Sequence, residues 1–169
     1  TVQRFEELRP EMVVIATSTP TIHTDLLMAR VAKERIGAFT VLVDTHVTVF
    51  HQELVSETFV DAAVRGEFEV AIPEIADSLS RGADLSRVPG VTWKRDQTVT
   101  VNPDRPLIKD LDELPWPDRD LVPAEQYIVG LRTQDPCFMV MASRGCPFRC
   151  TFCLWVPVMF YNKVRLRDV

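Results

Sequence analysis

Three cysteines fall within eight residues near the end of the chain, and this spacing constrains the local fold more than any other feature of the sequence. Cys146, Cys150 and Cys153 have the pattern C-x3-C-x2-C. We expect the segment to form a loop that wraps its three thiols around a common object. Three soft thiolate ligands suit an iron–sulfur cluster or a zinc ion.

Composition and charge narrow the class of protein. The chain has 169 residues, 46% of them hydrophobic and 25% charged, which is enough for one small domain plus a piece of another. A net charge of −5 disfavours a general nucleic-acid-binding protein. No apolar run approaches the roughly 18 residues of a transmembrane helix, and residues 1–10 lack the apolar core of a signal peptide. We therefore expect a soluble, cytoplasmic protein, in which clustered cysteines indicate metal or redox chemistry.

The first half of the chain alternates between strand-like and helix-like segments. Three continuous apolar runs have the length and composition of strands that are buried on both faces. Helical segments lie between and after these runs, and Thr19 is a candidate N-cap for the first helix. The expected strands span residues 12–17, 39–43 and 59–64, and the expected helices span residues 21–35, 52–55 and 69–79. This alternation predicts an α/β fold with a Rossmann-like parallel sheet.

The second half of the chain has a different character. Residues 90–101 have β-branched arms around a polar centre, which predicts a β-hairpin. Residues 102–136 combine many prolines with acidic residues, so we expect an extended connector. Residues 138–142 form another apolar run, which predicts a buried strand leading into the cysteine loop. The side chains expected to anchor the connector are Leu111, Leu114, Trp116, Leu121 and Tyr127.

The cysteine loop resembles the signature of the radical S-adenosylmethionine (radical SAM) superfamily, C-x3-C-x-(aromatic)-C, with Phe152 as the aromatic residue. The resemblance implies that Cys146, Cys150 and Cys153 each bind one iron of a [4Fe–4S] cluster. S-adenosylmethionine would chelate the fourth iron, and Phe152 would lie beside its adenine. The reduced cluster would then cleave S-adenosylmethionine and support radical chemistry or methyl transfer. In such enzymes the cofactors carry the chemistry and the protein positions them.

The ends of the three expected strands resemble the loops of cobalamin-binding domains that precede radical SAM barrels. Parallel α/β domains bind ligands at this edge. His46 and Thr48 match a Gly-Gly-x-His-x-Thr pattern, although Val43 and Asp44 replace its glycines, and residues 65–69 match Arg-Gly-Glu-x-Glu. No Asp-x-His-x-x-Gly motif occurs, so no histidine is assigned as an axial cobalt ligand. The resemblance implies cobalamin contacts from Ser18, Thr19, Thr45, His46, Thr48, Gly66 and Glu67.

The resemblance covers nearly the whole chain and divides it into three parts. Residues 1–88 correspond to a partial cobalamin-binding domain and residues 89–136 to a hairpin and proline-rich linker. Residues 137–169 correspond to the first strand and cluster loop of a truncated radical SAM βα barrel. Such a barrel needs roughly 200 residues, so we expect this chain alone to be inactive. Within the family, the chain most resembles the hopanoid-biosynthesis-associated subgroup. This resemblance implies a small-molecule substrate that is lipid-like or isoprenoid. It also implies flavodoxin or ferredoxin as the electron donor.

Two other interpretations remain open at this point. The cysteine loop, with Cys137 as a fourth ligand, could hold a structural zinc ion in a non-catalytic binding module. Alternatively, the chain could be a radical SAM enzyme whose α/β domain binds no cobalamin. A methylthiotransferase is disfavoured because the chain has no cysteine before Cys137 to hold a second cluster.

Overall fold

Three parallel strands form the centre of the fold in the computed structural model, which describes residues 2–121, 138 and 140–168. They are β1 (Met12–Ala16), β2 (Phe39–Val43) and β3 (Ala62–Val64). The prediction of parallel strands at these positions is confirmed. β2 lies between the other two, and its residues after Phe39 are all buried, as expected for an apolar run covered on both faces.

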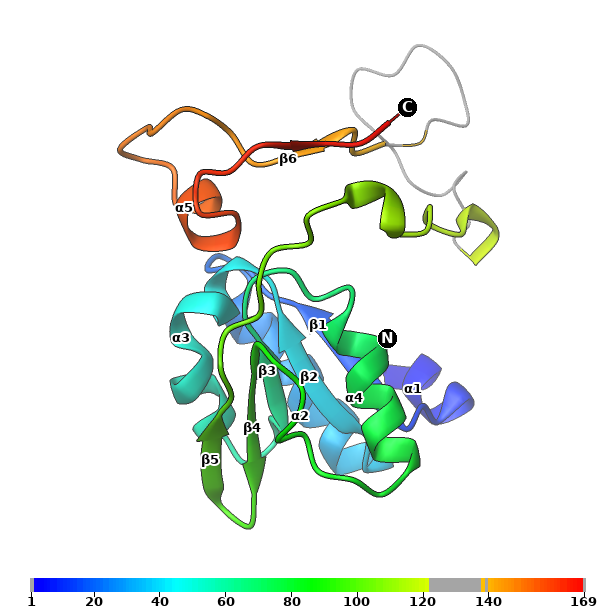
Figure 1. Ribbon diagram of the computed structural model, residues 1–169. Coiled ribbons are helices and arrows are strands. Elements are labelled where there is room, and N and C mark those ends of the chain that lie inside the picture. Colours follow the sequence, from blue (N-terminus) through cyan, green and yellow to red (C-terminus); the bar gives the residue numbers. More distant parts are fainter. Residues whose placement is uncertain (1, 122–137, 139, 169) are drawn as a thin grey trace.

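Helices cover the two faces of the sheet, as Figure 1 shows. On one face, α4 (Ala71–Ser80) packs against Val41 and Val43 of β2. On the other face, α2 (Ile22–Ile36) and α3 (Thr45–Ser56) pack against Leu42. This separation follows from the alternation of side chains along β2. A short helix, α1 (Val2–Leu8), precedes β1 and lies beside α2.

A β-hairpin extends the parallel strands into a mixed sheet. Its arms are β4 (Val91–Arg95) and β5 (Thr98–Val101), so the hairpin prediction is confirmed. β4 pairs antiparallel with β3, and the sheet order is β1-β2-β3-β4-β5. The predicted parallel sheet is therefore present at β1, β2 and β3, but the hairpin, which we expected as a separate unit, makes the whole sheet mixed. Val91 and Trp93 of the hairpin join the same buried cluster as α4, and this burial favours docking of the hairpin on β3.

Several predicted boundaries differ from those observed. The helix expected at residues 52–55 is α3, which begins at Thr45 because the Asp44 side chain accepts a hydrogen bond from the Thr45 backbone N–H. The strand expected at residues 59–64 begins only at Ala62. Thr21, not Thr19, stands at the N-cap position of α2.

The connector and the C-terminal segment contain only short elements. The connector includes two 3-10 turns, η1 (Leu111–Glu113) and η2 (Arg119–Leu121). The C-terminal segment contains β6 (Ser143–Arg144), α5 (Trp155–Met159) and β7 (Arg165–Leu166), and β6 pairs with β7. Leu111 is buried and Leu114 half-buried, but Trp116 and Leu121 are exposed, so the predicted anchoring is correct only in part. Tyr127 and Cys137 lie outside the described residues.

The prediction of a buried strand at residues 138–142 is wrong for the residues that the structure describes there. Phe138, Val140 and Met141 are exposed at 43%, 55% and 51%, and strand pairing begins only at Ser143. A strand buried on both faces needs covering elements on each side. In the described part of the chain, β6 has β7 as its only strand partner.

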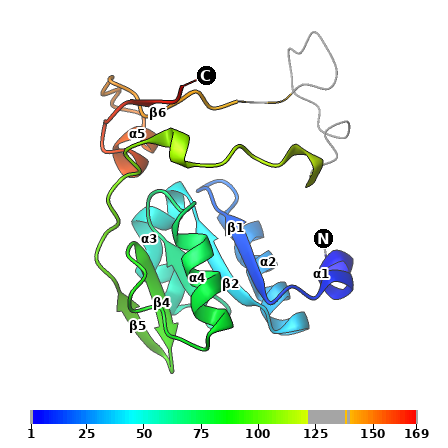
Figure 2. The same cartoon turned by 45° about the vertical axis from the view of Figure 1, so that its right-hand side comes forward.

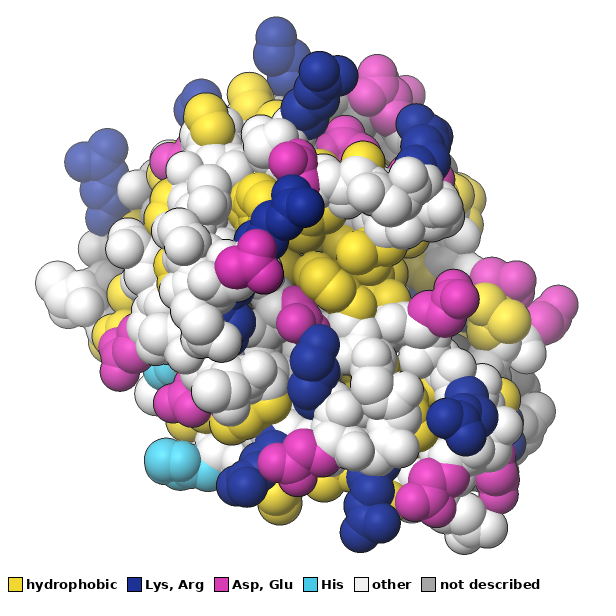
Figure 3. Space-filling view, turned by 90° about the horizontal axis from the view of Figure 1, so that it is seen from below, with side chains coloured by type: hydrophobic (Ala, Val, Ile, Leu, Met, Phe, Trp, Pro, Cys, Tyr) yellow, Lys and Arg dark blue, Asp and Glu magenta, His cyan; other side chains and the backbone are white. Residues whose placement is uncertain are grey.

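The C-terminal segment lies above the edge where the parallel strands end, and both ribbon views agree on this arrangement (Figures 1 and 2). The opposite end of the molecule shows hydrophobic side chains gathered in a hollow among charged side chains (Figure 3). No helix within the described ranges combines the length and apolar character needed to cross a membrane.

Candidate functional site

Two hydrogen bonds join the loops that follow the three parallel strands. Thr19 Oγ1, after β1, is 3.0 Å from His46 Nδ1 in the first turn of α3. Thr48 Oγ1, two residues further along α3, accepts a hydrogen bond of 2.9 Å from the Gly66 backbone N–H after β3. Four of the residues predicted to bind cobalamin are thus brought together in two pairs at the carboxyl edge of the sheet.

Two other predicted residues make local contacts at the same edge. Ser18 Oγ is 2.9 Å from Thr21 Oγ1, and Thr45 Oγ1 donates a hydrogen bond of 2.7 Å to Asp44 Oδ1. Asp44 itself has φ +88° and ψ −168°, a conformation that glycine adopts far more readily than other residues. Asp44 therefore has a backbone conformation that favours glycine, the residue that it replaces in the Gly-Gly-x-His-x-Thr pattern.

Glu67, which we expected to contact cobalamin, is buried and hydrogen-bonded to other parts of the protein. It is only 5% exposed, and both carboxylate oxygens accept hydrogen bonds from protein groups: the Ile108 N–H, Arg144 and Arg165. Burial by itself would raise the pKa of Glu67, but the hydrogen bonds from Arg165, Arg144 and Ile108 outweigh it and hold the pKa below its ordinary value. The carboxylate is therefore ionised, and both of its oxygens accept hydrogen bonds from other groups of the protein.

The predicted cluster ligands lie in one loop directly after β6. Cys146 and Cys153 are half-buried, Cys150 is exposed, and none of the three forms a disulfide. Phe152, predicted to lie beside adenine, is 89% exposed. Three free thiols within eight residues fit a [4Fe–4S] cluster by donor chemistry. Within the described ranges, however, no three His, Cys, Asp or Glu side chains meet in a metal-binding arrangement, so the loop must close around a cluster to hold it.

One contact at this edge was not expected from the sequence. Thr48 Oγ1 lies 3.4 Å from the Met159 sulfur, and both Met159 and Phe160 are buried. The apolar run that contains them was visible in the sequence, but no pattern showed which surface would cover it. The contact places α5, which follows the cysteine loop, beside the predicted cobalamin residues of α3.

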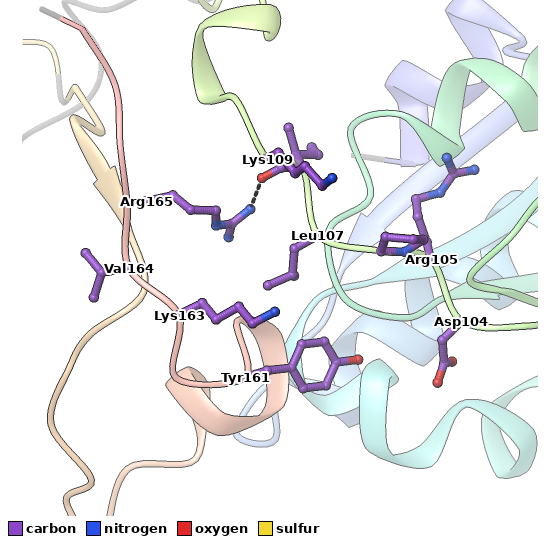
Figure 4. A pocket seen from close by; sticks show the side chains of 10 residues that line it. Asp104, Arg105, Leu107, Lys109, Tyr161, Lys163, Val164 and Arg165 are labelled. Atoms are coloured by element: carbon purple, nitrogen blue, oxygen red, sulfur yellow. Dashed lines mark hydrogen bonds between the residues drawn. The ribbon is translucent and has the colours of Figure 1, made fainter.

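An open cleft of about 810 Å³ separates the connector from the C-terminal segment. Figure 4 shows Leu107 and Lys163 in this cleft, together with Tyr161. Arg165 crosses from β7 to the connector and donates a hydrogen bond of 2.5 Å to the Ile108 carbonyl. This cleft could not be predicted from the sequence, because its two walls are more than 50 residues apart in the chain. Its lining includes the basic residues Arg105, Lys109, Lys163 and Arg165.

Comparison with known proteins identifies relatives of this chain. No protein-family model matches it. An uncharacterized methyltransferase from Pyrococcus horikoshii is 38% identical over 153 residues, covering 88% of this chain and 32% of the relative. An anaerobic magnesium-protoporphyrin IX monomethyl ester cyclase from Rubrivivax gelatinosus is 32% identical over 98% of this chain and 30% of its own length. The chain thus spans about a third of the length of these relatives.

A hopanoid C-3 methylase from Methylococcus capsulatus is 33% identical over 80% of this chain and 25% of the relative, in agreement with the expected hopanoid resemblance. Among solved structures, the fold is similar to that of TsrM from Kitasatospora setae, a radical S-adenosylmethionine methyltransferase with cobalamin and a [4Fe–4S] cluster bound. The TM-score is 0.68 at 15% identity, over 99% of this chain and 35% of TsrM. This likeness shows a common fold.

Proposed function

The chain belongs to the cobalamin-binding radical SAM enzyme family, and we propose that it supplies the cobalamin site and the cluster-binding cysteines of such an enzyme. The observation that supports this most strongly is the placement of the two predicted sites. The C-x3-C-x-Phe-C loop and α5 lie above the carboxyl edge of the sheet, where the contact between Thr48 and Met159 joins them. Residues that would hold two cofactors are thereby brought to one junction.

At the cysteine loop, the thiolates of Cys146, Cys150 and Cys153 would hold a [4Fe–4S] cluster, and Phe152 would lie beside the adenine of S-adenosylmethionine. When bound, the cluster and S-adenosylmethionine supply a one-electron reductive cleavage. The protein's part is to present three thiolates and to leave one iron free. Exposure of Cys150 and Phe152 leaves the loop accessible for both cofactors.

At the sheet edge, hydroxyl, imidazole and backbone N–H groups would bind the polar rim of cobalamin. We assign this role to Ser18, Thr19, Thr45, His46, Thr48 and Gly66. The hydrogen bonds between Thr19 and His46 and between Gly66 and Thr48 hold these groups in place before a ligand arrives. Such preorganisation lowers the entropy lost on binding.

The reaction of the whole enzyme would be methyl transfer or another radical modification of an unreactive substrate. The relationship to the hopanoid C-3 methylase favours a lipid-like or isoprenoid substrate. Flavodoxin or ferredoxin would supply the electron. We expect the 169-residue chain alone to produce no 5′-deoxyadenosine above the level of a cysteine-free control.

Cobalamin retention tests the edge assignment. The chain is incubated with cobalamin, passed through gel filtration, and its cobalt content is measured. We expect His46→Ala and Thr48→Val to lower retention at least about tenfold together, since each removes a group that orders the edge. His23→Ala, an exposed histidine on α2, serves as the matched control and should retain cobalt like the unaltered chain. Absence of retained cobalt in the unaltered chain would favour a family member whose α/β domain binds no cobalamin.

A further inference from the structure

We propose that Glu67 is a positioning residue that docks the base of the cysteine loop onto the α/β unit. Glu67 lies in the loop between β3 and α4, and its side chain is only 3% exposed. The docking role is inferred only from contacts between residues of this chain. The effect of docking on the cluster rests on the proposed function.

The carboxylate of Glu67 joins three segments that are far apart in the sequence. Oε1 accepts a hydrogen bond of 2.9 Å from Arg144 of β6. Oε2 accepts one of 2.8 Å from Arg165 of β7 and another of 2.8 Å from the backbone N–H of Ile108 in the connector. Both strands of the C-terminal pair and the connector therefore meet on one side chain.

The acidic and basic side chains at the contact between Glu67 and the two C-terminal strands balance in charge. Arg144 also pairs with Glu69, so two carboxylates face two guanidinium groups at this junction. The Nε and Nη2 atoms of Arg165 are buried and have no hydrogen-bond partner within the described part of the chain. Removing the Glu67 charge would leave Arg144 with Glu69 alone and Arg165 without an acidic partner. A buried charge that loses its partner is strongly destabilised, so the strands would leave this position.

The docked strands form the base of the cysteine loop. Arg144 is followed directly by Gly145 and Cys146, while Gly145 lies against the backbone of Lys163 on the returning segment. On the other side, Gly66 precedes Glu67 and donates its backbone N–H to Thr48. Glu67 thus connects the position of the first cluster ligand with the predicted cobalamin edge, through neighbouring residues on each side. This role replaces its expected contact with cobalamin.

Hydrogen exchange on the 169-residue, cofactor-free chain tests the docking. Glu67→Gln keeps the shape of the side chain and removes its charge. We expect amide exchange in residues 143–144 and 165–167 to become at least about tenfold faster, the factor associated with one charge-assisted hydrogen bond. Exchange in β1, β2 and β3 should stay unchanged, because the sheet core does not depend on this contact. Unchanged protection of β6 and β7 would overturn the proposal.

Glu74→Gln is the matched control. Glu74 is also an acidic residue that pairs with an arginine of the connector, Arg105, but among the residues that the structure describes it forms no hydrogen bond or ion pair with β6 or β7. This variant should leave exchange in β6 and β7 unchanged. If Glu67→Gln fails to fold, Arg165→Gln tests the same contact from the other side, outside the α/β core. Equal loss of protection in the Glu74 and Glu67 variants would contradict a specific docking role.

Anaerobic reconstitution with iron and sulfide tests the consequence for the cluster. We expect Glu67→Gln to lose at least half of the bound cluster absorbance, whereas Glu74→Gln retains it. Full retention of the cluster, with an unchanged electron paramagnetic resonance spectrum, in an undocked Glu67→Gln variant would overturn the positioning role. A failure of the unaltered chain to take up any cluster would contradict the proposed function instead, and the exchange result would still decide the docking.

Discussion

At the scale of single residues, Asp44 has two opposing effects on stability at the start of α3, the helix that carries His46. Its backbone lies in a region of φ and ψ that costs about 1–3 kcal/mol for residues other than glycine. Its carboxylate caps α3 through the Thr45 backbone N–H at 2.6 Å. The sequence showed that Asp44 replaces a glycine of the cobalamin-domain pattern, and the structure shows that its backbone conformation is one that favours glycine. The side chain compensates through its capping hydrogen bond.

Substitutions at Asp44 separate these two effects. Asp44→Ala loses the cap and keeps the strain, so we expect the free energy of unfolding to fall by about 1 kcal/mol. Asp44→Gly loses the cap but relieves the strain, and should be more stable than Asp44→Ala by about 1–2 kcal/mol. Urea unfolding followed by circular dichroism measures both. Equal stabilities of the two variants would show that the backbone at residue 44 is not strained.

The ionisation of Glu67 predicts how docking depends on pH. Its pKa is lowered in the folded chain from an ordinary value of 4.5, so the folded state favours the charged carboxylate. The docking contribution is therefore complete above about pH 4.5 and declines as the pH falls through the lowered value. Exchange in β6 and β7, corrected for the intrinsic pH dependence of exchange, should show this loosening. A Glu67→Gln chain should lack it, and a loosening of equal size in that variant would assign the effect to another group.

At the scale of elements, the close approach of two backbone segments determines the start of the cysteine loop. A Cβ atom added to Gly145 would lie 1.8 Å from the Lys163 carbonyl oxygen, and Gly145 has φ +91°. We expect Gly145→Ala to separate β6 from β7 and to expose their amides to exchange. Gly82→Ala is the control, because Gly82 also has positive φ but nothing lies within 4 Å of an added Cβ. Loss of β6–β7 protection in both variants would contradict the role of close approach.

Elements whose patterns depend on local contacts were predicted well. Apolar runs of strand length predicted β1 and β2, because they indicate burial on both faces. A glycine that can adopt a left-handed conformation predicted the end of α2 at Gly37. The polar centre between two β-branched arms predicted the hairpin of β4 and β5. The apolar run at residues 138–142 was wrongly placed because burial of such a run depends on covering elements, and the sequence of the run does not say whether they are present.

At the scale of the whole molecule, the site depends on contacts between distant segments. Motif spacing predicted the three cysteines as cluster ligands and predicted that Thr19, His46, Thr48 and Gly66 lie at one edge of the sheet, where the structure pairs them. It could not show that Glu67 faces Arg144 and Arg165, since these arginines lie 77 and 98 residues away and belong to no motif. The Arg-Gly-Glu-x-Glu pattern predicted a cobalamin contact for its first glutamate, and we propose a docking role for that residue instead.

We propose that one junction of this chain serves both a [4Fe–4S] cluster and cobalamin. The most direct test of this proposal is the content of iron, sulfide, cobalt and zinc after anaerobic reconstitution with cobalamin present. The chain is compared with a Cys146→Ala/Cys150→Ala/Cys153→Ala variant. We predict about four irons and four sulfides per chain, lost in the variant, with cobalt bound to both. Stoichiometric zinc without sulfide would contradict the claim and establish the cysteine loop as a structural zinc site.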